Sequence, residues 1–365
     1  MKQKKLLIFM PSIEGGGVEK NLFIISKFLA HNINKVFLIT ASKKYKNKFD
    51  RKIDLILPKL NMWDKLGRKV KYLICLILLL KKFIIEKNII VLCFQANIYC
   101  IILCKIFNKK IIVRSNSSPT GWSKNSLKNL IFKKILNKAD QIIVNSLEFK
   151  KELKNRFEVD AACIYNPLNS KEIIIKSKAI SPKIFKDKKS LKIINIGRYT
   201  EQKDQATLLK GLKNLDNKIN YEAVIVGKGL LKNKLIHYSK NNGLNNKIKF
   251  INFLSNPYPL IKQADIFVLS SAYEGLPNVL LEALTLNKFI ISTSCPTGPK
   301  EILLNGKGGL LFKVGDYNEL TNKILYYLNN KKKCKAMLKI AHNQLHRFDY
   351  NSNLQKYLNL VNKLI

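Results

Sequence analysis

The feature that most constrains the fold of this 365-residue chain is its alternation of short apolar runs with helical stretches. Apolar runs rich in β-branched residues predict buried strands, and the amphipathic segments between most of them predict helices. Such alternation is typical of βαβ units, in which parallel strands are joined through helices. The sequence therefore predicts an α/β fold with parallel sheets. In the first half we expect strands at residues 6–10, 35–40, 53–57, 89–94, 111–114, 141–145 and 162–165.

The pattern restarts after a stretch rich in Lys, Ser and Pro that follows Pro167, which predicts two domains. Strands are expected at residues 191–197, 223–226, 248–251, 266–269 and 289–292, and helices alone from 317 to 365. We expect two Rossmann-like, doubly wound domains at residues 1–170 and 171–345. A C-terminal helix within 346–365 is expected to pack back on the first domain. Open parallel sheets bind ligands beyond the carboxyl ends of their strands, so the chemistry is expected in strand-to-helix loops and in a central cleft.

The chain is strongly basic, with 66 Lys and Arg against 24 Asp and Glu, a formal net charge of +42. A surface of this kind favours an anionic partner, namely nucleic acid, acidic lipid or a phosphorylated substrate. The alternative is compositional drift in a chain crowded with Lys, Asn and Ile. No helix-turn-helix, zinc-finger, RNP or KH signature is present in the sequence, which argues against a specific nucleic-acid partner.

The seven cysteines predict neither disulfides nor a metal site, because their number is odd and none forms a C-x-x-C pair. They indicate a reducing compartment, the cytosol. The apolar N-terminus is too short for a secretory signal and is better interpreted as a first strand. The apolar run at 72–80 ends at Lys81 and Lys82, about half the length that a membrane span needs.

Two glycine-containing loops follow predicted strands. Gly15, Gly16 and Gly17 precede an amphipathic helix, where backbone N–H groups can approach an acceptor or a phosphate; a plain tight turn is the alternative. The second loop runs from Gly197 through Arg198 to Lys203. An arginine fork together with a lysine point charge suits the oxygens of a diphosphate.

The most specific motif is a loop and helix that carry two glutamates. Glu274 precedes the predicted helix, and Glu282 lies within it, about 7–8 Å further along its axis. This separation suits two carboxylates that bind hydroxyl groups on two sugars of one ligand. The N–H groups of Gly275, Leu276, Asn278 and Val279, in the segment between them, can meet a phosphate. Glu282 stands in an apolar run, where a carboxylate needs a polar partner.

The pair Glu274 and Glu282, with seven residues between them, resembles the E-x7-E motif of retaining family-4 glycosyltransferases of the GT-B fold. The resemblance extends over most of the chain in the family's order. The Gly15–Gly17 loop resembles the N-terminal glycine loop, and Arg198 and Lys203 occupy the places of the diphosphate-binding Arg and Lys. Residues 226–229, with Gly227, resemble the loop near the nucleoside, and residues 298–311 resemble the stretch after the donor helix.

The resemblance implies a nucleotide-sugar held by the C-terminal half. Arg198 and Lys203 would neutralise the departing diphosphate, Glu282 would hold the ribose, and Glu274 would hold the donor sugar. Transfer would retain the anomeric configuration without a metal or other cofactor. The expected donor is a UDP-linked hexose or N-acetylhexosamine, with GDP-mannose left open. Many relatives carry a His in an N-domain loop near the donor sugar. The corresponding loop here, residues 114–119, contains no His, and Asn116 or Ser117 is expected to contact the sugar or acceptor instead.

The expected acceptor is a polyprenyl-diphosphate-linked glycan or another oligosaccharide of the kind used in surface polysaccharide. Residues 65–86 carry an apolar stripe, including Leu73 and Ile77, among lysines. The stripe is either the core face of an ordinary helix or a docking element for anionic lipid. With the net charge, this predicts a cytoplasmic enzyme bound peripherally to the inner face of the cytoplasmic membrane. A sugar-nucleotide epimerase and a nucleic-acid-binding protein are the competing predictions, and the scarcity of His argues against the epimerase.

Overall fold

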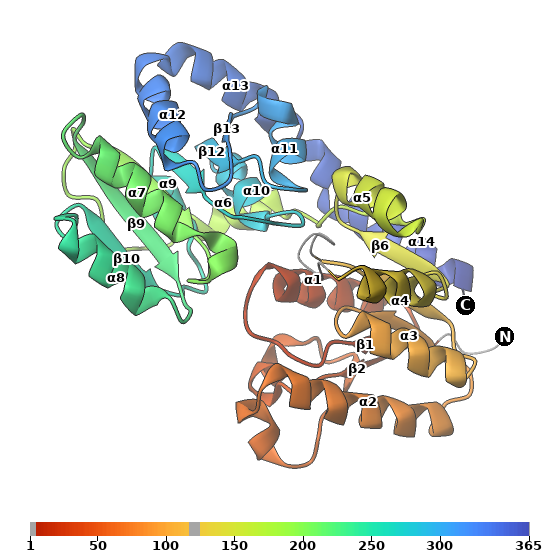
Figure 1. The fold of residues 1–365 in the computed structure, drawn as a ribbon. Helices are drawn as coiled ribbons and strands as arrows, with labels where there is room; N and C mark the ends of the chain where they lie inside the picture. Colours follow the sequence, from red (N-terminus) through yellow and green to blue (C-terminus); the bar gives the residue numbers. More distant parts are fainter. Residues whose placement is uncertain (1–4, 117–124, 365) are drawn as a thin grey trace. The chain divides into compact units, whose positions relative to one another are not determined.

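The computed structural model describes residues 5–116 and 125–364, and the chain forms two compact units. One unit comprises Met1–Pro167 and Tyr350–Ile365, and the other comprises Leu168–Asp349. Each unit is built on a parallel β-sheet with helices on its faces (Figure 1). The α/β class and the two Rossmann-like sheets expected from the sequence are confirmed.

The first unit contains, within its described residues, a sheet of seven parallel strands in the order β3-β2-β1-β4-β5-β6-β7. These strands are β1 (Lys5–Phe9), β2 (Lys35–Ile39), β3 (Ile53–Ile56), β4 (Ile90–Cys93), β5 (Ile111–Arg114), β6 (Gln141–Val144) and β7 (Ala162–Cys163). Leu6 and Ile8 pack on one side of the sheet and Leu7 and Phe9 on the other. Burial on both sides explains why these strands are continuous apolar runs in the sequence.

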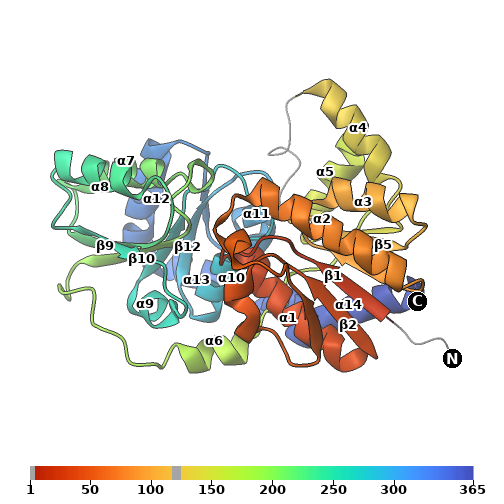
Figure 2. The ribbon, with the colours of Figure 1, turned by 90° about the horizontal axis from the view of Figure 1, so that it is seen from below.

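Helices cover both faces of this sheet (Figure 2). On one face lie α1 (Gly17–Asn32) and α14 (Tyr350–Leu364), which pack against each other. The other face is covered by α2 (Arg68–Ile85), α3 (Asn97–Ile106), α4 (Ser126–Leu136) and α5 (Leu147–Phe157). Two short 3-10 helices, η1 (Lys43–Lys48) and η2 (Asn61–Lys65), lie between β2 and α2.

The second unit contains a described sheet of six parallel strands in the order β10-β9-β8-β11-β12-β13. They are β8 (Leu191–Ile196), β9 (Tyr221–Gly227), β10 (Ile248–Asn252), β11 (Ile266–Leu269), β12 (Phe289–Thr293) and β13 (Leu310–Phe312). The last strand was not expected, because its three residues are too few to produce a readable pattern. It pairs in parallel with β12 at the sheet edge.

The helices of this unit complete the alternation. They are α6 (Ser170–Lys176), α7 (Gln205–Leu215), α8 (Lys232–Asn241), α9 (Tyr258–Gln263), α10 (Asn278–Thr285), α11 (Pro299–Ile302), α12 (Tyr317–Asn329) and α13 (Lys331–Asn343), with the 3-10 helices η4 (Glu201–Lys203), η5 (Leu304–Gly306) and η6 (Leu345–Phe348). The segment from residue 317 onward is helical, as expected.

All seven cysteines are free thiols, and all but Cys163 are buried. Burial raises the pKa of the Cys75 thiol to about 12, so this group remains protonated at neutral pH. Among the described residues no helix has both the length and the apolar composition that crossing a bilayer requires.

Candidate active site

The order of strands in the second unit determines where its functional loops meet. β8 and β11 are neighbours in the sheet, although two further strands, β9 and β10, and their helices separate them in the sequence. The strand order reverses at this pair, and such switch points are where open parallel sheets bind ligands. The loops that follow β8 and β11 contain Arg198, Lys203 and Glu274. The sheet therefore brings the loop with Arg198 and Lys203 and the loop with Glu274 together at the carboxyl ends of the strands.

Glycines allow the loops after β8 and β9 to touch through their backbones. A Cβ atom on Gly227 would lie 1.9 Å from the carbonyl oxygen of Gly197, so no larger residue fits there. The backbone N–H of Tyr199 donates to the carbonyl of Lys228 at 2.9 Å. The Tyr199 side chain is fully buried, and its hydroxyl lies 2.9 Å from the carbonyl oxygen of Ile225. Burial raises the pKa of this hydroxyl, which therefore stays neutral and structural.

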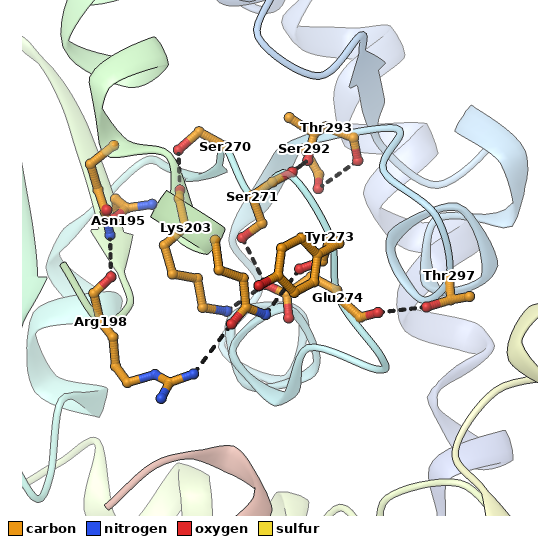
Figure 3. Close-up of polar contacts among 12 residues, drawn as sticks. Asn195, Arg198, Lys203, Ser270, Ser271, Tyr273, Glu274, Ser292, Thr293 and Thr297 are labelled. Carbon is orange, nitrogen blue, oxygen red and sulfur yellow. Dashed lines mark hydrogen bonds and ion pairs between the residues drawn. The ribbon is translucent and has the colours of Figure 1, made fainter. Parts of the chain in front are cut away.

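The centre of the site is an ion pair between the Lys203 ammonium and the Glu274 carboxylate (Figure 3). The two side chains are only 15% and 8% exposed. The Ser271 hydroxyl donates to the same Glu274 Oε1 at 2.7 Å. The carboxylate thus has two partners in a site with little solvent, where charge–charge interactions are stronger than in water.

Arg198 lies beside this pair and is linked to it through Gln202. An Nη2 group of Arg198 donates to Gln202 Oε1 at 3.2 Å, and Gln202 Nε2 donates to the carbonyl of Tyr273 at 3.0 Å. The N–H of Ala272 donates in turn to the Gln202 carbonyl at 2.8 Å. These bonds hold the two loops in register, so the cations of one loop and the carboxylate of the other keep fixed positions.

A third loop, which follows β12, supports the Glu274 loop from behind. Thr297 Oγ1 donates to the carbonyl of Glu274, and Thr293 Oγ1 donates to the carbonyl of Ser271, both at 2.7 Å. Gly298 has a φ of +87°, and a Cβ there would lie 2.2 Å from the carbonyl oxygen of Gly275. Only glycine satisfies both the left-handed backbone and this close approach.

Helix α10 begins directly after this loop, at Asn278, with Pro277 as its N-cap residue. The Leu276 side chain is buried, and residues Gly275 to Val279 form the end of the loop and the first turn of the helix. The N-terminus of a helix carries free N–H groups and a partial positive charge. Glu282 lies on the second turn, about 6 Å along the axis from Asn278, and is only 5% exposed.

The glycine loop of the first unit also lies at the carboxyl end of a strand, β1, and before a helix, α1. Gly15 has a φ of +79°, which favours glycine, and the helix begins at Gly17. The buried Glu19 carboxylate turns back and accepts the N–H of Glu14 at 3.2 Å. Glu14 forms a two-point ion pair with Arg68, at 2.6 and 3.1 Å. Two carboxylates at this loop disfavour a phosphate and favour hydroxyl groups as ligands.

Asn116 lies at the carboxyl ends of β4 and β5. Its Nδ2 group donates to the carbonyls of Phe94, at 2.9 Å, and Arg114, at 3.4 Å. Both amide hydrogens are therefore occupied by backbone, and the side-chain oxygen is the atom that remains for a ligand. Ser117, the other residue expected to contact a sugar or acceptor, lies outside the described residues.

The structure thus brings Arg198, Lys203 and Glu274 together and places Glu282 on the helix that follows. The residues that hold them, chiefly Gln202, Ser271 and Thr297, were not predicted from the sequence. A hydroxyl three residues before Glu274 and a polar residue next to Lys203 were the available signals. They were weak because their partners come from other loops. Within the described residues no cluster of His, Cys, Asp and Glu has the arrangement of a metal site.

Comparison with known proteins identifies a family model and relatives to which the segment with these loops is similar. Residues 176–344, which include all of the second-unit site, match the family model described as "Glycosyl transferases group 1". An uncharacterized glycosyltransferase of Methanocaldococcus jannaschii is 37% identical over 227 residues, which are 56% of this chain and 53% of that protein. The chain therefore spans about half the length of this curated relative.

A second relative is from Campylobacter jejuni. It is N-acetylgalactosamine-N,N'-diacetylbacillosaminyl-diphospho-undecaprenol 4-alpha-N-acetylgalactosaminyltransferase, 27% identical over 261 residues, 69% of this chain and 70% of the relative. Among solved structures, the Anabaena protein HepE in complex with UDP and glucose superposes with a TM-score of 0.78 at 17% identity, covering 99% of this chain and 100% of that one. This similarity establishes a shared GT-B fold.

Proposed function

We propose that this chain is a group 1 glycosyl transferase, the family whose model residues 176–344 match, and that it transfers a hexose or N-acetylhexosamine from a nucleotide-sugar to a sugar acceptor with retention of configuration. The observation that carries the proposal is the set of Lys203, Glu274 and Arg198 at the β8–β11 switch point. Two cations and a carboxylate, fixed by a common network, match a donor that has an anionic diphosphate beside a neutral, hydroxyl-rich sugar.

The role of the cations follows from the charge that develops during transfer. The bond between the anomeric carbon and the diphosphate oxygen breaks, and negative charge accumulates on that oxygen. Lys203 and Arg198 stabilise this charge from fixed positions, and the N–H groups at the start of α10 add partial positive charge. The acceptor oxygen bonds to the anomeric carbon on the face from which the diphosphate leaves, and its proton passes to the departing phosphate oxygen.

The two glutamates have separate tasks in this proposal. Glu274, which Ser271 and Lys203 orient, accepts hydrogen bonds from hydroxyl groups of the donor sugar. Glu282, further along α10, accepts hydrogen bonds from the ribose. Gly227, the closely packed last residue of β9, allows the nucleoside to approach the backbone. A carboxylate that accepts two hydroxyls fixes the sugar's orientation as well as adding affinity.

The proposed donor is a UDP-sugar, with GDP-mannose as the second candidate. The solved HepE complex contains UDP and glucose, and the Campylobacter jejuni relative is named as an N-acetylgalactosaminyltransferase. The first name supports UDP as the nucleotide, and the second supports an N-acetylhexosamine as the sugar. The stereochemistry of the sugar depends on a few contacts around Glu274, which the sequence alone does not distinguish.

The proposed acceptor is a glycan linked to a polyprenyl diphosphate, bound by the first unit. The name of the Campylobacter jejuni relative contains such an acceptor, a saccharide on diphospho-undecaprenol. In this chain the carboxylates of Glu14 and Glu19, together with Asn116, offer acceptors for glycan hydroxyls at the ends of β1 and β5. A lipid-linked acceptor requires the enzyme to work at a membrane, and we place it on the inner face of the cytoplasmic membrane.

The test is incubation of the purified chain with a panel of UDP- and GDP-sugars. Release of nucleoside diphosphate from one donor, followed by transfer to a synthetic polyprenyl-diphosphate glycan, is the expected result, and NMR of the product gives its anomeric configuration. Isomerisation of the donor without release of nucleotide would instead support the alternative, a sugar-nucleotide epimerase. Inverted product, or the absence of any donor turnover, would contradict the proposed function.

A further inference from the structure

The apolar stripe of the basic segment 65–86 faces away from the core. Helix α2 packs on the sheet through Cys75, Leu79 and Phe83. The stripe of Val70, Leu73, Ile77 and Ile84 follows the opposite side of the helix, because residues three and four apart share a face. Leu73 is 63% exposed and Ile84 is 69% exposed. The interpretation of this stripe as an ordinary core face is therefore wrong, and α2 is apolar on both sides.

Helices α3 and α4 continue this exposed apolar surface, with α3 packed beside α2 and α4 beside α3. α2, α3 and α4 lie side by side over the same face of the sheet, in both views of the fold (Figures 1 and 2). Of the large apolar side chains exposed in the described residues, half lie in these three helices, which have only 18, 10 and 11 residues. We call this set the α2–α4 surface: Val70, Leu73, Ile77, Ile84, Ile85, Tyr99, Ile102, Ile106, Leu127, Leu130 and Ile131.

Each of the three helices buries its other side. α3 packs inward through Cys100, Ile101 and Cys104, and α4 packs inward through Leu136. Ile106 is 71% exposed and Leu127 is 65% exposed. Both side chains therefore point away from the core. A concentration of exposed apolar side chains on neighbouring helices of a folded protein marks a site of interaction.

The charge of the same helices indicates what the surface meets. α2, α3 and α4 contain nine Lys and Arg residues and no Asp or Glu. Lys69, Lys81, Lys128 and Lys134 are exposed and pair with no acid in the described part of the chain. At 100° per residue, Lys69 and Lys81 flank the α2 stripe on its two sides, and Lys134 lies within the α4 stripe. Apolar residues bordered by lysines are complementary to acyl chains beneath anionic headgroups.

We propose that the α2–α4 surface is a membrane-docking face, on which three helices lie together in the interface of an anionic bilayer. The apolar side chains enter the boundary between headgroups and acyl chains, and the unpaired lysines contact the phosphates. A second copy of the chain would bring cationic helices against each other at a face without acids, which opposes self-association. This inference rests on the proposed function, because a lipid-linked acceptor gives the docking face its purpose.

The experiment measures flotation of the full chain with vesicles of phosphatidylcholine alone, or with about a third phosphatidylglycerol. We expect binding to the anionic vesicles that weakens in high salt. The quadruple variant Leu73→Ser, Ile84→Ser, Ile106→Ser and Leu130→Ser should bind about tenfold more weakly or worse. Its matched control, Ile180→Ser, Leu230→Ser, Phe253→Ser and Ile340→Ser, changes four exposed apolar residues of the second unit and should bind like the wild type.

The charge contribution has its own pair of variants. Lys69→Glu, Lys81→Glu and Lys134→Glu should abolish the preference for anionic vesicles. Lys332→Glu, Lys335→Glu and Lys339→Glu, which make the same change in net charge on exposed positions of α13, should retain it. Equal losses in both triple variants would mean that net charge alone drives binding and would overturn the assignment of this face.

Turnover of a water-soluble donor separates this inference from the proposed function. Wild-type donor hydrolysis without vesicle binding would overturn the docking face alone. Vesicle binding without any donor turnover would support the face and contradict the transferase. A wild type that is dimeric in solution, and becomes monomeric in the quadruple serine variant, would overturn the proposal by showing that a second copy covers the face.

Discussion

At the scale of single residues, the site depends on a charge pair that is largely shielded from water. Lys203 and Glu274 neutralise each other, and Ser271 supplies the carboxylate with a further hydrogen bond. Removing one member leaves the other charge uncompensated, which is more damaging than removing both. Measuring both the stability and the donor turnover of variants of this pair therefore distinguishes a functional role of Lys203 and Glu274 from a purely structural one.

We expect Lys203→Met to lower kcat/KM for the donor about 100-fold or more, because a fixed cation at the leaving group is lost. The same variant should also be less stable, by about 3 kcal/mol, since Glu274 is left unpaired. In the double variant Lys203→Met, Glu274→Gln, stability should largely return while activity does not. Urea unfolding and donor turnover measure the two quantities. If activity recovered with stability, the pair would be structural only; Lys332→Met is the surface control.

Gly298 provides a second prediction at this scale. Gly298→Ala forces a Cβ to within 2.2 Å of the Gly275 carbonyl in a residue whose φ is +87°. We expect it to displace the Glu274 loop, with a loss of donor turnover of about tenfold or more, since small misplacements at a reacting centre are costly. Gly315→Ala is the matched control, because Gly315 also has a positive φ, +78°, but open space around it. Equal activity in both variants would contradict the packing argument.

At the scale of elements, the C-terminal helix α14 is tied to the sheet of the first unit by a buried arginine. Arg114 Nε donates to the Tyr357 hydroxyl, and its Nη2 donates to Asn166 Oδ1, both at 2.7 Å. Arg114 and Tyr357 are fully buried, and burial raises the pKa of the Tyr357 hydroxyl. Asn166 stands just before the chain leaves this unit at Pro167, and α14 begins where the chain returns. One cation thus anchors both connections.

Tyr357→Phe is expected to lower the free energy of unfolding by about 1–3 kcal/mol, because the charged Arg114 loses a buried hydrogen-bond acceptor. Urea titration followed by circular dichroism measures the change. Tyr326→Phe, at a partly exposed position on α12, should change stability by less than about 0.5 kcal/mol. If both variants were equally stable, Arg114 would not anchor α14 in the way described.

The identity of most elements could be predicted from the sequence, whereas their roles could not. Buried parallel strands are uniform apolar runs, so β1 to β12 were expected within a few residues of their observed bounds. β13 was not predicted because three residues are too few to show a periodicity of apolar side chains. The stripe of α2 was readable as a helix face, but periodicity cannot tell which of two apolar faces packs on the sheet. Only the positions of Cys75 and Leu79 in the core decide that the stripe faces outward.

At the scale of the whole molecule, the dominant property is a formal net charge of +42. Like charges repel one another in the compact state, and salt shortens the range of that repulsion to about 10 Å at 0.1 M. We expect the Tm to rise when NaCl is increased from about 0.02 to about 0.3 M. Choline chloride at equal ionic strength should raise the Tm by the same amount if charge screening is the cause. A Tm that falls with salt would show that the ion pairs outweigh the repulsion.

The α/β class, the two-domain organisation and the residue types that the proposed transfer requires could all be predicted from the amino-acid sequence. This was possible because apolar periodicity, glycine turns and the Glu274–Glu282 spacing are local properties of the chain. Which of these residues contact one another depends on the packing of the folded chain. Lys203 and Glu274 are 71 residues apart and become partners only because β8 and β11 are adjacent in the sheet. Contacts across such distances, like the outward direction of the α2 stripe, are set by packing and have no local signature.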